Sequence, residues 1–545
     1  MKKLPIGMYT FEKLIKGGHV YADKTRYVYE LVQTEGAFFL SRPRRFGKSL
    51  LLSTFESLFS GPPEPDGTPQ GLFKDLWIGQ SDYDFSQKFP VVCLDMALNS
   101  STPEVLNAEI EDMLLKRAKP FGVEIDGPTP GSMLESLINC LADKYNTKVV
   151  LLIDEYDSPV SDNIDNIALV LKIRDILKSF YSKLKSCDKQ LRFVFVTGVT
   201  RYAFMGLSSG LNHLNDITLT QKYAGICGFT QDEFKTCFSD HLEVALEGMR
   251  GMDPVPADAT VADLADCFNK WYDGYSWDGK TRVLNPFSIL KCLEKTAFSN
   301  YWIQTNPSGS FLSKIAARNP LALLGDEAEK ISEEILGLAE VGSLGPVPAL
   351  FQTGYLTVDK VTAFDGGGTA FTMKIPNLEI KRTNIPLFVD SIYSLLGCDP
   401  ATERDTFKNA IMARDQARLT EIIDSVFAGL PAEHHANNES CYHKVLYGYC
   451  HKFGRIVIPE RKGAIGNSDL VVILPGRLYA VIELKFDAGD ETPKQVRLVS
   501  RLALEALEAI EKKDYWRPFQ SEANELVKIG LGVSYRGQCQ ARIGD

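Results

Sequence analysis

At 545 residues the chain is too long for one hydrophobic core, and its 44% hydrophobic and 24% charged residues are typical of an ordinary globular protein. Its net charge of −10 excludes a protein coated with positive charge for nucleic acid, although a local basic groove is compatible with that balance. No apolar run approaches the roughly 18 residues that a membrane helix needs, and no signal peptide is expected behind the N-terminal lysines. The 11 cysteines form no Cys-x-x-Cys pair, which indicates reduced thiols and a cytoplasmic protein.

Short apolar runs alternate with longer segments over the first 225 residues. Strands are predicted at 38–40, 91–94, 149–153 and 193–196, with a fifth candidate at 217–219. The segments between them are long enough for crossover helices, so the pattern predicts an α/β domain with a parallel sheet covered on both faces.

A phosphate-binding motif follows the first predicted strand. Gly47, Lys48 and Ser49 match the end of the pattern Gly-x4-Gly-Lys-Ser/Thr, in which backbone N–H groups surround the anion, the lysine reaches phosphate oxygens and the hydroxyl binds Mg²⁺. Arg42 stands where the pattern has its first glycine. Nucleotide contacts are predicted at Arg44, Arg45, Phe46, Gly47, Lys48 and Ser49. The alternative is a basic helix N-terminus without a nucleotide.

The predicted strand 149–153 ends in two acids, Asp154 and Glu155. In P-loop enzymes an acid at this place holds Mg²⁺, and a second group polarises the attacking water. Asp154 is therefore predicted to bind nucleotide and metal together with Ser49, and Glu155 to be catalytic. Thr197 lies at the tip of the strand 193–196, where a γ-phosphate sensor would lie, although a hydroxyl that caps a turn is the alternative. Arg201 is a candidate charge donor, and the sequence does not locate an arginine finger.

The middle of the chain is helical and aromatic from 226 to about 320. Residues 328–353 predict two helical segments, and strands predicted at 355–361 and 370–375 flank a glycine-rich turn. Helices followed by a hairpin indicate a winged-helix-like module, with a helical lid and stabilising hairpin as the alternative. The aromatic residues 271–275 are interpreted as core packing and not as a base-stacking platform.

The C-terminal part has the predicted order α-β-β-β-α-β. Its helices are expected at 439–452 and 494–513, and its strands at 455–458, 469–474, 478–485 and 525–533. The chain is accordingly divided into three predicted domains, 1–225, 226–400 and 401–545.

Two strands of this part carry a second candidate site. If Pro475-Gly476-Arg477 closes a hairpin, Leu474 faces Leu478 and Asp469 faces Glu483, with Cβ atoms about 4.5–5.5 Å apart. Two opposed carboxylates repel each other unless a cation bridges them, and Lys485 projects from the same face as Glu483. Asp469 and Glu483 are predicted to hold Mg²⁺, and both are predicted to be catalytic with Lys485 in phosphodiester cleavage. The alternative is an exposed strand face with a Glu/Lys pair.

The chain resembles the AAA-ATPase-like proteins of anaerobic bacteria, which pair an N-terminal ATPase-like domain with a C-terminal PD-(D/E)XK domain of the restriction-endonuclease-like fold. The resemblance is carried by residues 5–7, 22–25, 42–49, 153–157, 197–201, 271–275 and 301–302, and in the C-terminal part by residues 442–443, 460–461, 469 and 483–485. It implies ATP as the nucleotide, whereas the residues alone leave GTP open, and it implies that arginine at the first loop position is usual.

The resemblance also implies a further metal-binding acid, Glu439, on the predicted helix 439–452. His443 shares its face and is expected to pack there, and Glu460 is a competing acid. One departure is Ala509, which stands where relatives carry glutamine.

The sequence as a whole predicts an ATP-dependent switch coupled to a Mg²⁺-dependent nuclease that acts on DNA or RNA. A nucleotide-sensing protein whose C-terminal domain only binds a nucleic acid or a protein partner is the alternative. No membrane partner is expected, and a homo-oligomer is compatible with the sequence.

Overall fold

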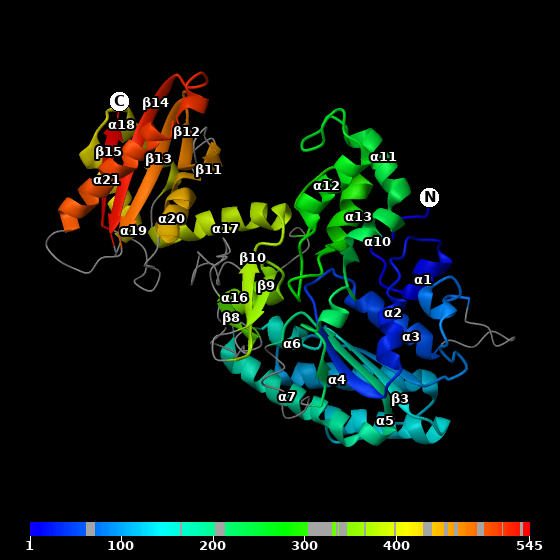
Figure 1. Ribbon diagram of the computed structural model, residues 1–545. Coiled ribbons are helices and arrows are strands. Elements are labelled where there is room, and N and C mark those ends of the chain that lie inside the picture. The colour runs from blue at the N-terminus through cyan, green and yellow to red at the C-terminus, as the bar shows by residue number, and fades with distance from the viewer. Residues whose placement is uncertain are drawn as a thin grey trace. The chain divides into compact units, whose positions relative to one another are not determined.

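The computed structural model describes residues 1–60, 71–163, 166–201, 213–302, 330–333, 336, 346–363, 367–396, 399–428, 439–451, 456–462, 467–487, 495–514, 516–534 and 538–544. These residues form two compact units (Figure 1). The first contains the described residues up to 302 and from 330 to Lys381, and the second begins at Arg382. The predicted middle region thus groups with the first unit as far as Lys381. The division into three domains remains a prediction.

A five-stranded parallel sheet lies at the centre of the first unit. Its order is β2-β3-β4-β1-β5, so β4 lies between β1 and β3. The strands are β1 (Gly36–Ser41), β2 (Val91–Asp95), β3 (Val149–Asp154), β4 (Leu191–Gly198) and β5 (Asn215–Asp216). Four strands are confirmed where they were predicted. The prediction of the fifth at 217–219 was wrong by two residues, because the strand consists of residues 215 and 216 and its last backbone hydrogen bond to β1 runs from the N–H of Ile217 to the carbonyl oxygen of Phe39 at 3.0 Å.

Helices cover both faces of this sheet (Figure 1), as predicted. Helix α3 (Lys48–Ser60) lies on one face, and α4 (Pro103–Ala118), α5 (Pro130–Tyr145) and α7 (Ile167–Ser186) lie on the other. The other helices of this region are α1 (Phe11–Lys16), α2 (Thr25–Val32) and α6 (Ser158–Ser161). Alternate residues of β4 point to opposite faces. Phe193 and Phe195 each contact Phe55 of α3 with ring centroids 5.0 Å apart. Val194 and Val196 belong instead to the core shared with α4, α5 and α7.

The rest of the first unit is a helical cluster and two small antiparallel sheets. The elements are β6 (Phe229–Thr230), α10 (Gln231–Cys237), α11 (Ser239–Met249), α12 (Val261–Tyr272), β7 (Val283–Leu284), α13 (Pro286–Lys295), β8 (Lys330–Ser332), α16 (Pro346–Gln352), β9 (Thr357–Ala363) and β10 (Thr369–Lys374). The predicted hairpin is confirmed as β9 and β10, and Trp271 and Tyr272 lie in the helical core, as interpreted. The prediction of two helices within 328–353 was wrong for the first helix in part, because Lys330–Ser332 forms a strand that pairs with β10.

The second unit contains a mixed sheet in the order β11-β12-β13-β14-β15, in which only β13 and β14 are parallel. Helix α17 (Leu378–Leu396) begins in the first unit and continues into the second. The other elements are α18 (Pro400–Met412), α19 (Gln416–Ala428), α20 (Glu439–His451), β11 (Ile456–Lys462), β12 (Asn467–Leu474), β13 (Leu478–Asp487), α21 (Gln495–Lys512), β14 (Glu525–Ser534) and β15 (Cys539–Gly544). The predicted α-β-β-β-α-β order is confirmed. Strand β15 was not predicted, although its buried Cys539 and Ala541 alternate with more exposed residues.

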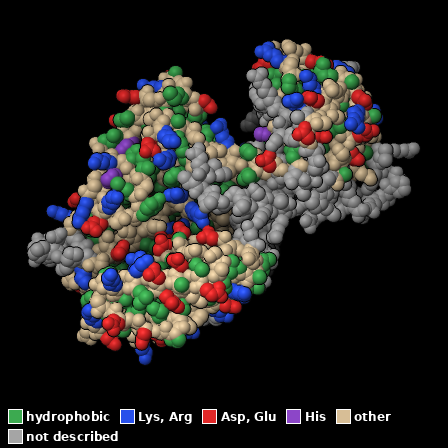
Figure 2. All heavy atoms as spheres, turned by 180° about the vertical axis from the view of Figure 1, so that it is seen from behind, with side chains coloured by type: hydrophobic (Ala, Val, Ile, Leu, Met, Phe, Trp, Pro, Cys, Tyr) green, Lys and Arg blue, Asp and Glu red, His purple; other side chains and the backbone are tan. Residues whose placement is uncertain are grey.

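The surface carries charges of both signs. On the face drawn in Figure 2, Lys and Arg side chains are interspersed with Asp and Glu over the described parts of the molecule. Of the described helices, none combines the length and the apolar character that crossing a membrane requires.

Candidate functional site

The loop between β1 and α3 places the phosphate-binding motif at a helix N-terminus. Arg45 and Gly47 have φ values of 72° and 97°, in the left-handed region that only glycine adopts without strain. Gly47 therefore needs to be glycine, whereas Arg45 is held in place by its surroundings. The turn leads into α3, whose first N–H groups and dipole favour an anion.

Arg42, at the position of the missing glycine, is directed away from the loop. Its side chain is fully buried and donates hydrogen bonds to the carbonyl oxygens of Ser41 (2.8 Å), Thr218 (3.0 Å) and Tyr223 (3.2 Å). Its guanidinium lies 3.9 Å from the ring centroid of Trp277. Burial lowers the pKa of Arg42 to about 10, so the side chain remains charged at neutral pH. Arg42 thus joins the end of β1 to the segment that follows β5.

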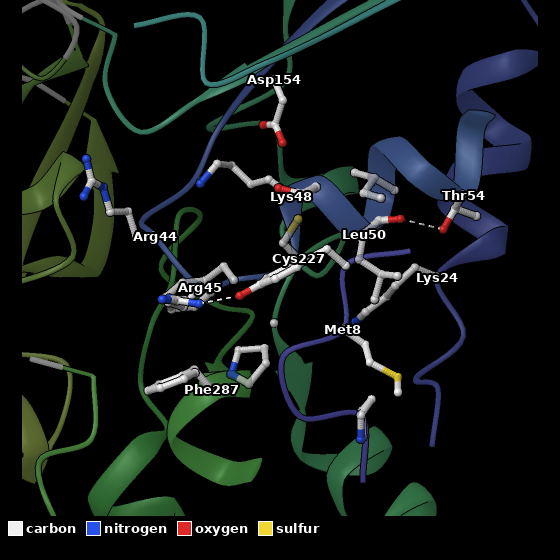
Figure 3. A pocket seen from close by; sticks show the side chains of 18 of the residues that line it. Met8, Lys24, Arg44, Arg45, Lys48, Leu50, Thr54, Asp154, Cys227 and Phe287 are labelled. Carbon is white, nitrogen blue, oxygen red and sulfur yellow. Dashed lines mark hydrogen bonds between the residues drawn. The ribbon is translucent and has the colours of Figure 1, made fainter. Parts of the chain in front are cut away.

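Lys48 and Ser49 lie beside the acid at the end of β3. Lys48 is buried and donates to the carbonyl oxygens of Arg42 (3.0 Å) and Pro43 (3.2 Å). Burial lowers the pKa of Lys48, while the charge of Asp154 opposes that shift. Burial raises the pKa of Asp154, and a hydrogen bond from the Ser49 side chain opposes it. Figure 3 shows the Asp154 carboxylate directed toward the same space as the Lys48 ammonium group.

Glu155 lies at a sharp turn after β3. It has a φ value of 49°, and its N–H donates to Oδ1 of Asp154 at 3.0 Å. Burial raises the pKa of its carboxyl, an effect that Lys48 opposes. Asp157 secures the same turn, because it accepts hydrogen bonds from the N–H groups of Val199 (3.2 Å) and Thr200 (2.7 Å). A carboxylate whose pKa is raised and which lies in a cavity is a candidate general base.

Lys48, Ser49, Asp154 and Glu155 line one cavity of about 790 Å³, a volume within the roughly 300–1,000 Å³ of small-molecule sites. The structure brings together eight of the predicted residues there: Arg44, Arg45, Phe46, Gly47, Lys48, Ser49, Asp154 and Glu155. Further walls come from the N-terminal segment, the first turns of α3, the ends of β2 and β3, residues 226–229 and the start of α13. The cavity thus joins the phosphate loop to parts of the chain that are distant in sequence.

Several lining residues were missed by sequence reasoning. Asp95 is the last residue of β2 and pairs with Asp154 in the sheet. An acid at the end of a strand is a sequence signal that could have identified it. Tyr9 accepts a hydrogen bond from Arg45 at 2.6 Å, and the Arg45 guanidinium lies 5.1 Å from the ring of Phe287 (Figure 3). Lys24 forms an ion pair with Glu233 at 2.6 Å. The latter contacts had no sequence signal, because each joins residues that are distant in sequence.

Thr197 and Arg201 do not line this cavity. The Thr197 hydroxyl is buried and donates to the carbonyl oxygen of Leu40 at 2.8 Å. Arg201 forms an ion pair with Asp216 at 2.6 Å, and its N–H donates to Gln352. The roles of γ-phosphate sensor and charge donor therefore remain predictions for these two residues.

The second candidate site lies on β12 and β13. The predicted turn is confirmed, since Leu474 pairs with Leu478, and the pairing continues to Leu470 opposite Ile482. Asp469 and Glu483 are the next residues outward on the two strands. Glu483 is only 2% exposed, and its Oε1 lies 3.4 Å from Nζ of Lys485. The structure thus brings Glu483 and Lys485 together, as predicted.

The helix that carries Glu439 contacts the other face of this sheet. Glu483 shares its face with Tyr479 and Val481, which lie in one core with Ile510 of α21. Phe486 points to the opposite face of β13. Its ring stacks on that of Tyr442 in α20, with ring centroids 5.4 Å apart. The metal-binding role of Glu439 remains a prediction. Within the part of the chain that the structure describes, no group of three or more His, Cys, Asp or Glu side chains is arranged to hold a metal ion.

The fold and the two sites define a P-loop domain of the ATPase type followed by a nuclease-type domain. Residues 5–208 match the family described as predicted AAA-ATPase, and residues 437–538 match the PD-(D/E)XK nuclease superfamily. The chain therefore contains an AAA-ATPase-like domain and a C-terminal domain of the PD-(D/E)XK nuclease superfamily. It is also similar to an "Uncharacterized protein in vnfD 5'region" of Azotobacter chroococcum mcd 1, with 29% identity over 544 residues that cover 98% of this chain and 96% of that protein.

Proposed function

We propose that the first unit binds ATP with Mg²⁺ in the cavity and hydrolyses it. The observation that carries the proposal is the convergence of Lys48, Ser49, Asp154 and Glu155 on one cavity at a helix N-terminus. The Ser49 hydroxyl and the Asp154 carboxylate both line this cavity, and they are oxygen ligands of the kind that Mg²⁺ prefers.

Each residue has a distinct role in this proposal. Lys48 neutralises phosphate oxygens, and its present carbonyl partners are the groups that a phosphate would replace. Ser49 and Asp154 hold the magnesium ion, which supplies charge neutralisation between the phosphates when it is bound. Glu155 orients the attacking water, and burial raises the pKa of its carboxyl, which makes it a stronger base than an exposed glutamate.

Calorimetric titration with ATP, with and without Mg²⁺, tests this half of the proposal. Lys48→Met should weaken binding by about 30-fold or more, because losing a hydrogen bond to a charged group costs roughly 2 kcal/mol. Glu155→Gln should retain binding and lose hydrolysis. Lys172→Met, on the exposed face of α7, is the control. Equal binding by the Lys48 and Lys172 variants would contradict the proposal.

We also propose that the second unit cleaves phosphodiester bonds in nucleic acid with Mg²⁺ held by Asp469 and Glu483. The supporting observation is the buried Glu483 with Lys485 at 3.4 Å, on a strand whose register leads to Asp469. In the proposed step water positioned by Lys485 attacks phosphorus and loses a proton to solvent, while the bond to the leaving oxygen breaks and that oxygen takes up a proton from solvent. Mg²⁺ held by Asp469 and Glu483 would lower the pKa of that water.

Labelled single- and double-stranded DNA and RNA provide the test. Wild type should cleave one of them with Mg²⁺ and not with a chelator, and Asp469→Asn and Glu483→Gln should each reduce the rate by at least about 100-fold. Glu525→Gln, at the other end of the parallel pair β13 and β14, is the control. Equal cleavage by all variants would identify a contaminant. Binding without cleavage by wild type would favour a C-terminal unit that only docks a partner.

A further inference from the structure

The phosphate loop is held from outside by residues far along the chain. The ring of Phe46 contacts Tyr275 and Trp277 with centroids 4.8 and 5.7 Å apart. The indole N–H of Trp302 donates to the carbonyl oxygen of Arg44 at 3.1 Å, and the N–H of Gly228 donates to that of Phe46 at 3.0 Å. Two alternate peptide units of the loop are therefore each bonded to the middle of the chain.

These two bonds orient N–H groups as well as carbonyls. In a planar trans peptide the N–H points opposite to the C=O. Holding the Arg44 carbonyl toward Trp302 therefore points the N–H of Arg45 away from Trp302. Holding the Phe46 carbonyl toward Gly228 does the same for the N–H of Gly47. Since Arg45 has a φ of 72°, an unfavourable backbone conformation is stabilised from outside the loop.

Trp302 is itself anchored by a buried carboxylate at the start of α17. Its backbone N–H donates to Oε1 of Glu379 at 2.9 Å, and the hydroxyl of Ser288 donates to both carboxylate oxygens at 3.0 and 2.8 Å. Glu379 and Trp302 are both fully buried. The lack of a side chain at Gly354 leaves room for the Trp302 ring beside the loop. A Cβ at this position would lie 2.9 Å from Pro43 and 3.3 Å from Trp302.

We propose that Trp302 and Glu379 are positioning residues for the nucleotide: Glu379 holds Trp302, and Trp302 holds the loop peptide whose N–H faces the phosphate. The inference rests on the proposed binding of ATP in the cavity. Its consequence is that nucleotide affinity depends on the first turn of α17, the helix that continues into the second unit. Binding of ATP must stabilise this arrangement in return, because coupling between two sites is reciprocal.

The test compares two identical substitutions in the full-length chain. Trp302→Phe removes the indole donor, and Trp271→Phe removes an indole from the helical core, where that ring packs against Tyr272 and Phe298. Trp302→Phe should raise the Kd for ATP by about 10-fold, as expected for one lost hydrogen bond, while Trp271→Phe leaves it within about twofold. The melting temperature without nucleotide is measured for both, so that a loss of fold is separated from a loss of positioning.

A pair of substitutions at Glu379 gives the second readout. Glu379→Leu removes the acceptor and should raise the Kd as Trp302→Phe does, and Glu379→Gln, which keeps a carbonyl oxygen, should recover most of the affinity. The Trp302→Phe/Glu379→Leu double variant should bind no more weakly than the weaker single variant, because the two residues act in series. If Trp302→Phe does not fold, the Glu379 pair decides the question.

The outcomes separate this inference from the function beneath it. If wild type does not bind ATP, the proposed function fails and the inference fails with it. If wild type binds ATP and the Trp302 and Trp271 variants bind it equally well, the inference alone is overturned. Equal Kd values for Glu379→Leu and Glu379→Gln would overturn it as well.

Discussion

Two buried charged side chains show how single residues support the phosphate loop. Arg42 replaces the expected glycine and donates to three carbonyl oxygens behind the loop. Glu379 accepts from Trp302 and Ser288. A buried charge is tolerated when hydrogen bonds replace its hydration, and these bonds do so for the Glu379 carboxylate and for the two terminal nitrogens of Arg42, whose Nε has no partner among the described residues. The motif therefore departs from its consensus without losing its geometry.

Arg42→Gly restores the consensus glycine, and it is nevertheless expected to destabilise the first unit by about 3 kcal/mol, because it removes a buried cation and its partners. Arg117→Ala, an exposed arginine on α4, should change stability by less than about 0.5 kcal/mol. Urea unfolding monitored by tryptophan fluorescence measures both, and four of the five tryptophans lie in the first unit. An Arg42→Gly protein as stable as wild type would show that Arg42 only occupies space.

Glu379 should make stability depend on pH. Burial raises its pKa to about 7 from the ordinary 4.5. Below pH 4.5 the carboxyl is protonated in both the folded and the unfolded chain. As the pH rises from 4.5 to about 7, the unfolded chain releases the proton while the folded chain keeps it, so stability falls. Burial keeps the neighbouring Tyr272, Tyr275 and Cys292 neutral in this range, since it raises the pKa of each.

Between pH 4.5 and 7.5 the wild type should therefore lose about 3 kcal/mol relative to Glu379→Gln, which cannot titrate. Urea unfolding of the two proteins at both pH values measures the difference. Parallel stability curves would mean that Glu379 does not titrate in this window.

At the scale of the elements, glycines permit the close contact between α21 and β14. A Cβ at Gly530 would lie 2.1 Å from the carbonyl oxygen of Ala503, and one at Gly532 would lie 2.0 Å from that of Val499. These glycines pair in register with Glu483 and Lys485 on β13. The packing of α21 on the sheet and the placement of the second site thus depend on the same glycines.

Gly530→Ala should destabilise the second unit by roughly 1–3 kcal/mol, because the helix must move away from the sheet. Gly248→Ala is the control. Gly248 lies on the exposed side of α11, and a Cβ there would have its nearest neighbour at 3.7 Å. This control should stabilise the first unit by up to about 1 kcal/mol, as alanine does in a helix. Calorimetric unfolding distinguishes the two directions, and a neutral Gly530→Ala would contradict the close packing.

At the scale of the whole molecule, an AAA-ATPase-like domain and a PD-(D/E)XK domain share one chain. The relative from Azotobacter chroococcum mcd 1 matches 98% of this chain, so the similarity also covers the region between the two domains. That region contains Trp302 and Glu379 and the start of α17. The loop contacts made there indicate that the ATPase-like domain is completed by residues outside the matched range 5–208.

ATP with Mg²⁺ at about 100 times its Kd should stabilise the first unit by about 2.7 kcal/mol. Thermal unfolding of the full chain measures the shift. Lys48→Met should abolish it, whereas Glu483→Gln, on β13 of the second unit, should retain it. A shift that persists in the Lys48 variant would place nucleotide binding elsewhere in the chain.

Contiguous patterns in the sequence predicted much of the fold and the phosphate site. The parallel strands, the loop that ends in Gly47-Lys48-Ser49 and the acids after β3 were found because local hydrophobic runs and neighbouring residues specify them. The hairpin of β12 and β13 was found for the same reason, since a short turn sets the pairing of its two strands. The short edge strand β5 was misplaced, and β8 was missed, because their pairing depends on distant partners.

The sequence by itself therefore determined the two domain types, most of the order of their elements and the candidate residues of the two sites. Only the tertiary structure decided which of those residues share a cavity, that Thr197 faces Leu40, and that Arg42 lies behind the loop. It alone revealed that Trp302 bonds to Arg44 across 258 positions of the chain. The physical reason is that motifs record interactions between neighbours, whereas burial and long-range hydrogen bonds exist only once the chain has folded.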